Sequence, residues 1–186
     1  MYLSRIKIDN FRKFESLDLT LNPGLNLLVG ENDSGKSAII DAVRFVLRTR
    51  DYEWLRLTRD DFHINSVGGR TNELRIECYF EGLSEEESSC FLEWLGVQLP
   101  EDEGLPPTYS LKVWFEATRK EPDEITGRFD REISVSFQAG PDEVGTRVAG
   151  EARDLLRTTY LKPLRDAESE LAAKRGSRLS QILLAH

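Results

Sequence analysis

Alternating apolar and polar positions open the chain and predict two short strands. The alternation runs through residues 6–8 and again through residues 17–21, and this period of two is typical of strands with one buried face. The turn sequence Asn-Pro-Gly at residues 22–24 separates them from a third run, LNLLV at residues 25–29. This run is the most apolar of the three, so we expect a buried strand inside the sheet.

Helical spacing follows the next loop. Apolar residues recur at positions three and four apart, which predicts a helix that ends near residues 48–50. The members of this stripe are Ile39, Ile40, Val43, Val46 and Leu47.

The middle of the chain returns to alternation, at residues 74–80, 111–115 and 133–137. This pattern predicts half-buried antiparallel strands. A helix is expected between the first two, with Ser84 as N-cap, three glutamates in its first turn and an end before Gly96. Residues 99–107 and 120–131 have the composition of surface loops.

Helix is predicted again from Glu151 onward. Leu155 and Leu156 are expected on one face, and Pro163 should break the helix. A final helix should run through four apolar positions, Leu171, Leu179, Ile182 and Leu183.

Together these elements predict an α/β fold. It is a mixed sheet around a phosphate-binding loop, with an antiparallel arm and flanking helices. The 186 residues suit one domain or one lobe of a larger one. We divide them into a loop core (1–60), an antiparallel arm (61–150) and a helical segment (151–186).

Charge is unevenly distributed along the chain. Residues 61–150 contain 19 acidic and 8 basic residues, a net charge of −11 within a total of −8. Since Lys and Arg clusters hold a phosphate backbone, this segment is a poor candidate for a DNA-binding surface. The sequence contains no long apolar run, so neither a membrane span nor a signal peptide is predicted. A cytoplasmic protein is therefore expected. Cys78 and Cys90 lack metal-ligand spacing and are interpreted as packing residues.

The strongest chemical signal is GENDSGKS at residues 30–37, which satisfies the phosphate-loop pattern G-x-x-x-x-G-K-[ST]. Gly30 and Gly35 are expected to take backbone angles closed to other residues, so that successive N–H groups surround a phosphate. The start of the following helix also favours an anion. Lys36 should reach the β and γ phosphates, and the Ser37 hydroxyl should join the Mg²⁺ shell.

ATP with Mg²⁺ is therefore the expected ligand pair. The residues predicted to contact the nucleotide are Gly30, Asn32, Asp33, Ser34, Gly35, Lys36, Ser37 and Ala38.

Hydrolysis needs more than this loop, namely an acid that binds Mg²⁺ and another that orients water. The nearest mimic, VWFE at residues 113–116, lies in an alternating strand and is interpreted as structural. The catalytic acid is therefore unassigned, and the chain alone is expected to bind ATP without turning it over.

A family resemblance rests on the N-terminal strand, Asn10-Phe11-Arg12, a short hairpin, and GLNLLVGENDSGKSAIIDAVRFVL. These residues resemble the opening of the ABC-type ATPases of the RecF, SMC and OLD group. In that group the Asn-Phe-Arg turn lies near the nucleotide, which implies Arg12 as an additional phosphate or base contact. A surface arginine on a hairpin is the alternative interpretation.

Three later features resemble the OLD family, ATPases usually fused to a Toprim nuclease. They are RDDF at residues 59–62, the strand and helix across 74–94, and YLKPLRDAE at 160–168 followed by RGSRLSQ at 175–181. The resemblance implies an ATPase that closes as a homodimer of heads and regulates a nuclease, with DNA contacts made by parts absent from this sequence. The signature loop, the Asp-Glu pair, the switch histidine and the Toprim domain are among those parts.

Two further clusters have structural interpretations. His63 beside Asp60 and Asp61 lacks a fourth metal ligand. Arg165 and Asp166 form a local ion pair more often than a catalytic dyad.

Two alternatives to an OLD-type ATPase stay open. One is a RecF- or SMC-like DNA-repair ATPase without its own nuclease. The other is a non-hydrolysing module that uses ATP to set its conformation or dimerisation. The DNA substrate, and a role in anti-phage defence or in repair, are left open.

Overall fold

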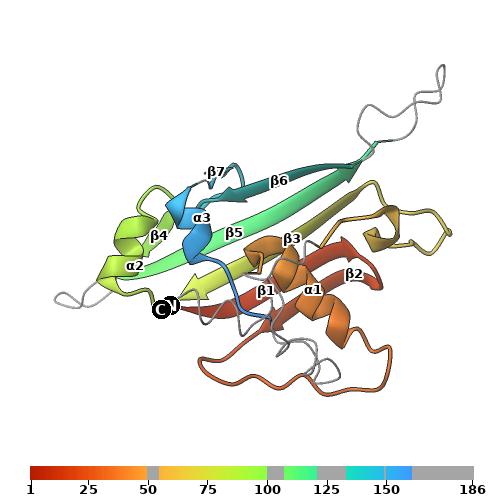
Figure 1. Cartoon of the computed structure of the whole chain (residues 1–186), viewed down its shortest axis with the longest axis horizontal. Helices are drawn as coiled ribbons and strands as arrows, with labels where there is room; N and C mark the ends of the chain where they lie inside the picture. Colours follow the sequence, from red (N-terminus) through yellow and green to blue (C-terminus); the bar gives the residue numbers. More distant parts are fainter. Residues whose placement is uncertain (50–54, 100–106, 121–132, 149, 161–186) are drawn as a thin grey trace, which may run out of the picture.

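The computed structural model describes residues 1–49, 55–99, 107–120, 133–148 and 150–160. These residues form an antiparallel sheet of seven strands. Six of them follow the order β2-β1-β3-β5-β6-β7, and the seventh, β4, pairs with β5. In Figure 1 the long strands run side by side, and α1 and α3 lie across the same face. The strands are β1 (Tyr2–Phe11), β2 (Phe14–Thr20), β3 (Glu73–Glu81), β4 (Leu95–Gln98), β5 (Thr108–Arg119), β6 (Ile133–Ala139) and β7 (Thr146–Arg147).

The core lies between this sheet and α1 (Lys36–Leu47). Ile8 of β1 pairs with Ile76 of β3, which in turn pairs with Phe115 of β5, so one row of apolar side chains crosses three strands. Phe45 of α1 packs on this row, with its ring stacked on Phe115 at 5.8 Å between centroids and edge-on to Phe11 at 5.9 Å. The predicted alternation is therefore confirmed for these strands, because Ile8, Ile76 and Phe115 lie on the face that α1 covers.

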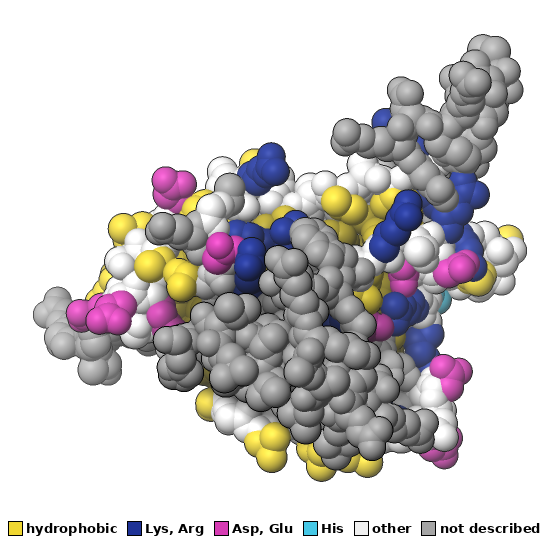
Figure 2. Space-filling model, in the orientation of Figure 1, with side chains coloured by type: hydrophobic (Ala, Val, Ile, Leu, Met, Phe, Trp, Pro, Cys, Tyr) yellow, Lys and Arg dark blue, Asp and Glu magenta, His cyan; other side chains and the backbone are white. Residues whose placement is uncertain are grey.

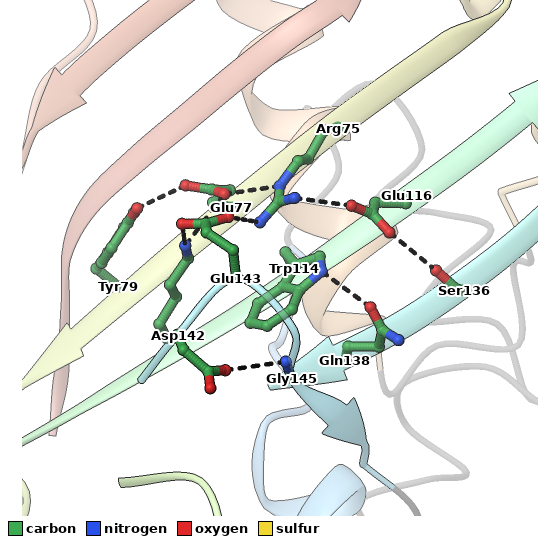
Figure 3. Close-up of polar contacts among 11 residues, drawn as sticks. Arg75, Glu77, Tyr79, Trp114, Glu116, Ser136, Gln138, Asp142, Glu143 and Gly145 are labelled. Carbon is green, nitrogen blue, oxygen red and sulfur yellow. Dashed lines mark hydrogen bonds and ion pairs between the residues drawn. The ribbon is translucent and has the colours of Figure 1, made fainter. Parts of the chain in front are cut away.

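Half-buried strands were predicted, with one face exposed. In the structure the face of β3 and β5 opposite α1 is partly buried as well. Trp114 is fully buried, and Glu77 and Lys112 are 7% and 9% exposed. The loop at residues 140–145 covers them, and its Glu143 carboxylate accepts hydrogen bonds from Lys112 Nζ at 2.6 Å and Arg75 NH2 at 2.5 Å (Figure 3). A Cβ on Gly145 would lie 2.2 Å from the Trp114 ring, so only glycine permits this approach. Alternation along one strand cannot reveal such a covering loop.

The prediction of a third strand at residues 25–29 is wrong. The segment belongs to no strand, and Leu25, Leu27 and Val29 are 95%, 81% and 83% exposed. Asn26 folds back on the turn before it, where its amide accepts from the N–H of Asn22 at 2.9 Å and donates to its carbonyl at 2.7 Å. A buried strand needs neighbours on both sides, and no strand of the described residues lies beside this segment. In Figure 2 yellow side chains gather along the lower edge, where Figure 1 draws the chain after β2.

The helices match their predictions in part, because the helix expected to end just before Gly96 already ends at Cys90, and a turn and β4 follow it. Helix α1 ends at Leu47, and α2 (Glu85–Cys90) begins with a capping box in which Ser84 Oγ accepts from the N–H of Glu87. Helix α3 (Glu151–Leu155) departs in one respect, because Leu156 is 3% exposed whereas Leu155 is 49% exposed. Adjacent residues on a helix point about 100° apart, so the two do not share a face.

Other expectations divide between confirmed, corrected and untested ones. Cys78 is buried, and burial raises its pKa, but Cys90 is exposed, which corrects its packing role. The short strands β4 and β7 and the 3-10 helix η1 (Arg59–Asp61) were not predicted. Most of the loops at 99–107 and 120–131, the break at Pro163, the final helix and Arg165-Asp166 lie outside the described residues. In the part of the chain that the structure describes, no helix has the length and apolar character to cross a membrane.

Candidate nucleotide site

The loop at residues 30–37 leads directly into α1, as the motif requires. Gly35 is the N-cap, with φ 102°, in the left-handed region that glycine adopts without strain. Asp33 also takes a left-handed conformation, with φ 64°. The loop is mostly exposed, whereas Ala38 in the first turn of α1 is 7% exposed. Backbone N–H groups at a helix start, next to left-handed residues, form the kind of concavity that binds a phosphate.

Gly30 has a different role from the one expected. It does not have a positive φ, but a Cβ built on it would lie 2.8 Å from Ser34 Oγ. The first glycine is therefore needed for space inside the loop, and the second for its backbone angle.

Lys36 turns back into the loop that precedes it. Its Nζ donates to the carbonyl oxygens of Gly30 at 2.7 Å and Glu31 at 2.6 Å, and to Ser34 Oγ at 3.2 Å. The ammonium thus lies against the loop that precedes α1, and its contact with a phosphate stays a prediction. Ser37 is exposed at the start of α1, so its hydroxyl is accessible to a metal ion beside that phosphate.

The tip of the β1–β2 hairpin lies against this loop. A Cβ on Gly35 would be 2.5 Å from Cζ of Phe14 and 2.9 Å from Cδ of Lys13, so both side chains touch the glycine face. Lys13 Nζ also donates a hydrogen bond to the carbonyl oxygen of Asp33. The hairpin therefore forms a wall of the candidate phosphate site.

Arg12 precedes this lysine but is bound elsewhere. Its Nε donates to Asp61 Oδ1 at 2.8 Å and its NH1 to Asp41 Oδ2 at 2.7 Å. Burial on its own lowers the pKa of Arg12, but the hydrogen bonds to Asp61 and Asp41 outweigh it and raise that pKa above its usual value. The structure places Arg12 next to α1, and a nucleotide contact by this residue stays a prediction.

His63 and the two aspartates near it each have a polar contact within the fold. His63 Nδ1 lies 2.9 Å from the Arg12 carbonyl oxygen, and Asp60 accepts from Arg70 at 2.8 Å. Asp61 accepts from the N–H of Thr58 at 2.8 Å in addition to Arg12. Among the described residues no cluster of three metal-ligand side chains occurs.

Glu116, the nearest mimic of a catalytic acid, lies on the sheet face away from α1. Its carboxylate accepts from Arg75 NH1 at 2.8 Å and from Ser136 Oγ at 3.4 Å (Figure 3). The sheet separates this carboxylate from the loop, so its structural interpretation agrees with its position.

Comparison with known proteins adds three findings. The model of the AAA ATPase domain family matches residues 1–172. Curated relatives described as DNA replication and repair protein RecF are similar over short segments: 43% identical over 53 residues in Actinobacillus pleuropneumoniae serotype 5b and 42% over 59 residues in Klebsiella pneumoniae. These matches cover 28% and 32% of this chain but only 15% and 16% of the relatives' length.

The third finding is structural. A solved chain from work on "ATP-driven dimerization and DNA stimulated activation of SMC ATPases" superposes with a TM-score of 0.51 at 16% identity, over 100% of this chain and 98% of the other. Sheet, loop and helix thus have the fold of a P-loop lobe of the ABC type, similar in fold to that SMC ATPase chain. The chain belongs to the AAA ATPase domain family.

Sequence reasoning missed three contributors to the site region. Lys13 and Phe14 were not singled out because a hairpin tip gives no periodic signal, and its position over Gly35 depends on tertiary contact. Asp61 was interpreted only within a loop motif, although it is 6% exposed and binds Arg12. The one available signal was chemical, since a buried aspartate needs a cationic or N–H partner.

Proposed function

We propose that this chain binds ATP with Mg²⁺ at residues 30–38 and forms the nucleotide-binding lobe of an ATPase. The observation that carries the proposal is the position of Lys36 at the start of α1. Its Nζ donates hydrogen bonds to the carbonyl oxygens of Gly30 and Glu31 in the preceding loop. Amides, an ammonium and the Ser37 hydroxyl are the donor set that a Mg²⁺-bound triphosphate requires. When bound, Mg²⁺ would neutralise phosphate charge, with Ser37 as its protein ligand on this side.

Titration calorimetry with ATP and Mg²⁺ tests this proposal. Lys36→Ala should raise the Kd by about tenfold to a hundredfold, because a charge-assisted contact contributes roughly 1.5 to 3 kcal/mol. Lys120→Ala, which removes the same charge from an exposed lysine just after β5, serves as the control and should bind like the parent. An unchanged Kd in a folded Lys36→Ala chain contradicts the assignment.

The complete protein is proposed to hydrolyse ATP and thereby regulate DNA processing by an OLD-family nuclease. Support comes from the resemblance of residues 59–62 and 74–94 to that family and from the family model across residues 1–172. In the OLD, RecF and SMC group two ATPase heads close around nucleotides. By analogy we propose ATP-dependent homodimerisation here, with DNA contacts outside the acidic middle segment.

A RecF- or SMC-like repair ATPase without a nuclease is the second candidate, favoured by the 43% identity to RecF over 53 residues. The coding sequence downstream of His186 discriminates between the two. A signature loop and an acidic Toprim cluster would support the OLD-type nuclease, whereas a RecF-type continuation or a long heptad repeat would support the repair ATPase.

A further inference from the structure

The turn at the tip of the β1–β2 hairpin carries two adjacent cations, and the structure gives them different surroundings. Arg12 is bound by the carboxylates of Asp41 and Asp61 and lies 4.9 Å from the ring of Phe11. Two of its nitrogens are therefore engaged within the fold, and its side chain is 31% exposed. Lys13, by contrast, is exposed and has no carboxylate partner among the described residues.

Lys13 is directed at the phosphate loop. Its Cδ packs at Gly35, and its ammonium donates to the carbonyl oxygen of Asp33, two residues earlier in the loop. Lys13 therefore contacts the loop through both its aliphatic stem and its charged end. The hairpin that carries it is fixed in turn, because the N–H of Arg12 donates to the Asp61 carbonyl at 2.7 Å and the N–H of His63 to the Asn10 carbonyl at 2.9 Å.

We propose that Lys13 is a second phosphate-binding lysine of this site, and that it, rather than Arg12, is the cation of the hairpin that contacts the polyphosphate chain of a nucleoside triphosphate. This assignment rests on the proposed function and extends it. A phosphate held by the loop amides lies one hydrogen bond away from the backbone that Lys13 already touches. A flexible four-carbon stem with three donors can move from a neutral carbonyl to an anionic oxygen, and a charge-assisted bond is the stronger of the two.

A second cation also suits the charge of a polyphosphate. Lys36 approaches the loop from α1, whereas Lys13 approaches from the hairpin, so the two ammonium groups would bind the polyphosphate from different elements. A triphosphate bound to Mg²⁺ and Lys36 alone keeps excess negative charge, which a second cation reduces. Binding also replaces the contact of Lys13 with Asp33, so nucleotide and hairpin become mechanically connected.

The test compares Lys13→Ala, Lys13→Arg, Arg12→Ala and Lys120→Ala with the parent chain, each titrated with MgATP and with adenosine. We expect Lys13→Ala to raise the Kd for ATP about tenfold, Lys13→Arg to recover most of that loss, and adenosine binding to be the same in both. Lys120→Ala removes an equal charge and should leave ATP binding unchanged. Arg12→Ala should lower the melting temperature more than Lys13→Ala does, because it removes two internal ion pairs.

The outcomes separate the two levels of the proposal. If the parent binds ATP and Lys13→Ala binds it equally tightly, or if Lys120→Ala loses as much affinity, the Lys13 assignment is overturned and the proposed function stands. If the folded parent chain does not bind ATP, the proposed function itself is overturned, and Lys13 with it.

Discussion

Asp61 accepts a hydrogen bond from Arg12 Nε at 2.8 Å, which connects η1 to the β1–β2 turn across 49 residues of sequence. The same carboxylate caps η1 through the N–H of Thr58 at 2.8 Å and its hydroxyl at 3.1 Å. One buried side chain thus contacts both the start of η1 and the hairpin that borders the phosphate loop.

We therefore expect Asp61→Asn to lower the free energy of unfolding by about 2 kcal/mol, because a buried charge-assisted pair contributes on this scale. Asp60→Asn is the matched control, since Asp60 pairs with Arg70 while 87% exposed and such pairs contribute about 0 to 1 kcal/mol. Urea unfolding of both variants measures the difference. Equal losses would show that the Asp61 network has no special role in stability.

Gly35→Ala should damage the loop more than an ordinary glycine replacement does. The left-handed angle alone costs an alanine roughly 1 to 2 kcal/mol. At Gly35 the new Cβ would in addition meet Phe14 at 2.5 Å, so the hairpin tip must move. Gly68→Ala isolates the first effect, because Gly68 has φ +85° and nothing within 4 Å of its Cβ position.

The measurement for this pair is ATP affinity together with thermal unfolding. Gly68→Ala should lose some stability and keep its affinity, whereas Gly35→Ala should lose both. If Gly35→Ala binds ATP like Gly68→Ala does, the contact between hairpin and loop does not matter for the ligand.

Arg153→Met is expected to stabilise the protein. The guanidinium of Arg153 lies 3.0 Å from the centroid of the Phe137 ring, and its NH1 is buried with no hydrogen-bond partner among the described residues. Burial, followed by the charges of Arg48 and Arg157, lowers the pKa of Arg153 to about 9. A lowered pKa in a base means that folding disfavours the charged form, so the penalty is fully present below the folded pKa and declines as the pH rises through it.

The gain from Arg153→Met should be about 1 to 3 kcal/mol, as for other replacements of buried charges by apolar groups. It should be constant from about pH 6 to pH 8, which lies below the folded pKa of Arg153. Arg147→Met, at an exposed arginine of β7, is the control and should change stability little. A loss of stability in Arg153→Met would show that the arginine is satisfied in solution.

The chain by itself is expected to bind ATP without releasing phosphate, because Glu116, the nearest mimic of a catalytic acid, is bound to Arg75 on the far sheet face. A phosphate-release assay on contaminant-free protein measures this, with Lys36→Ala as the control. Glu116→Gln should leave ATP affinity unchanged and lower stability modestly. Turnover that Lys36→Ala abolishes would reveal a catalytic acid close to the loop.

Local signals determined how much of this molecule sequence analysis could predict. Helix α1 and the strands β3, β5 and β6 were predicted because each has its own periodicity, and α2 because Ser84 caps it through backbone-specific chemistry. The phosphate loop was predicted for the same reason, since its spacing encodes its backbone shape.

Contacts between distant segments could not be predicted in this way. Trp114 is buried because the loop at residues 140–145 covers it. The close approach of Gly145 to the Trp114 ring depends on the tertiary structure, so the sequence alone does not reveal it. The prediction of a buried strand at residues 25–29 was wrong for the opposite reason. The apolar composition of this segment favours burial, but composition does not supply the neighbouring strands. Lys13 and Asp61 likewise have meaning only through partners 20 and 49 residues away.

The exposed run at residues 25–29 also affects the colloidal behaviour of this molecule. Leu25, Leu27 and Val29 occupy alternate positions of a segment that belongs to no strand, and each is more than 80% exposed. An uncovered apolar ribbon of this kind is a template for intermolecular strand addition, the first step toward amorphous or fibrillar aggregates. Solubility at high protein concentration should therefore depend on these five residues more than on any equal length of the acidic arm, and a single lysine at position 27 would act as a gatekeeper against self-association.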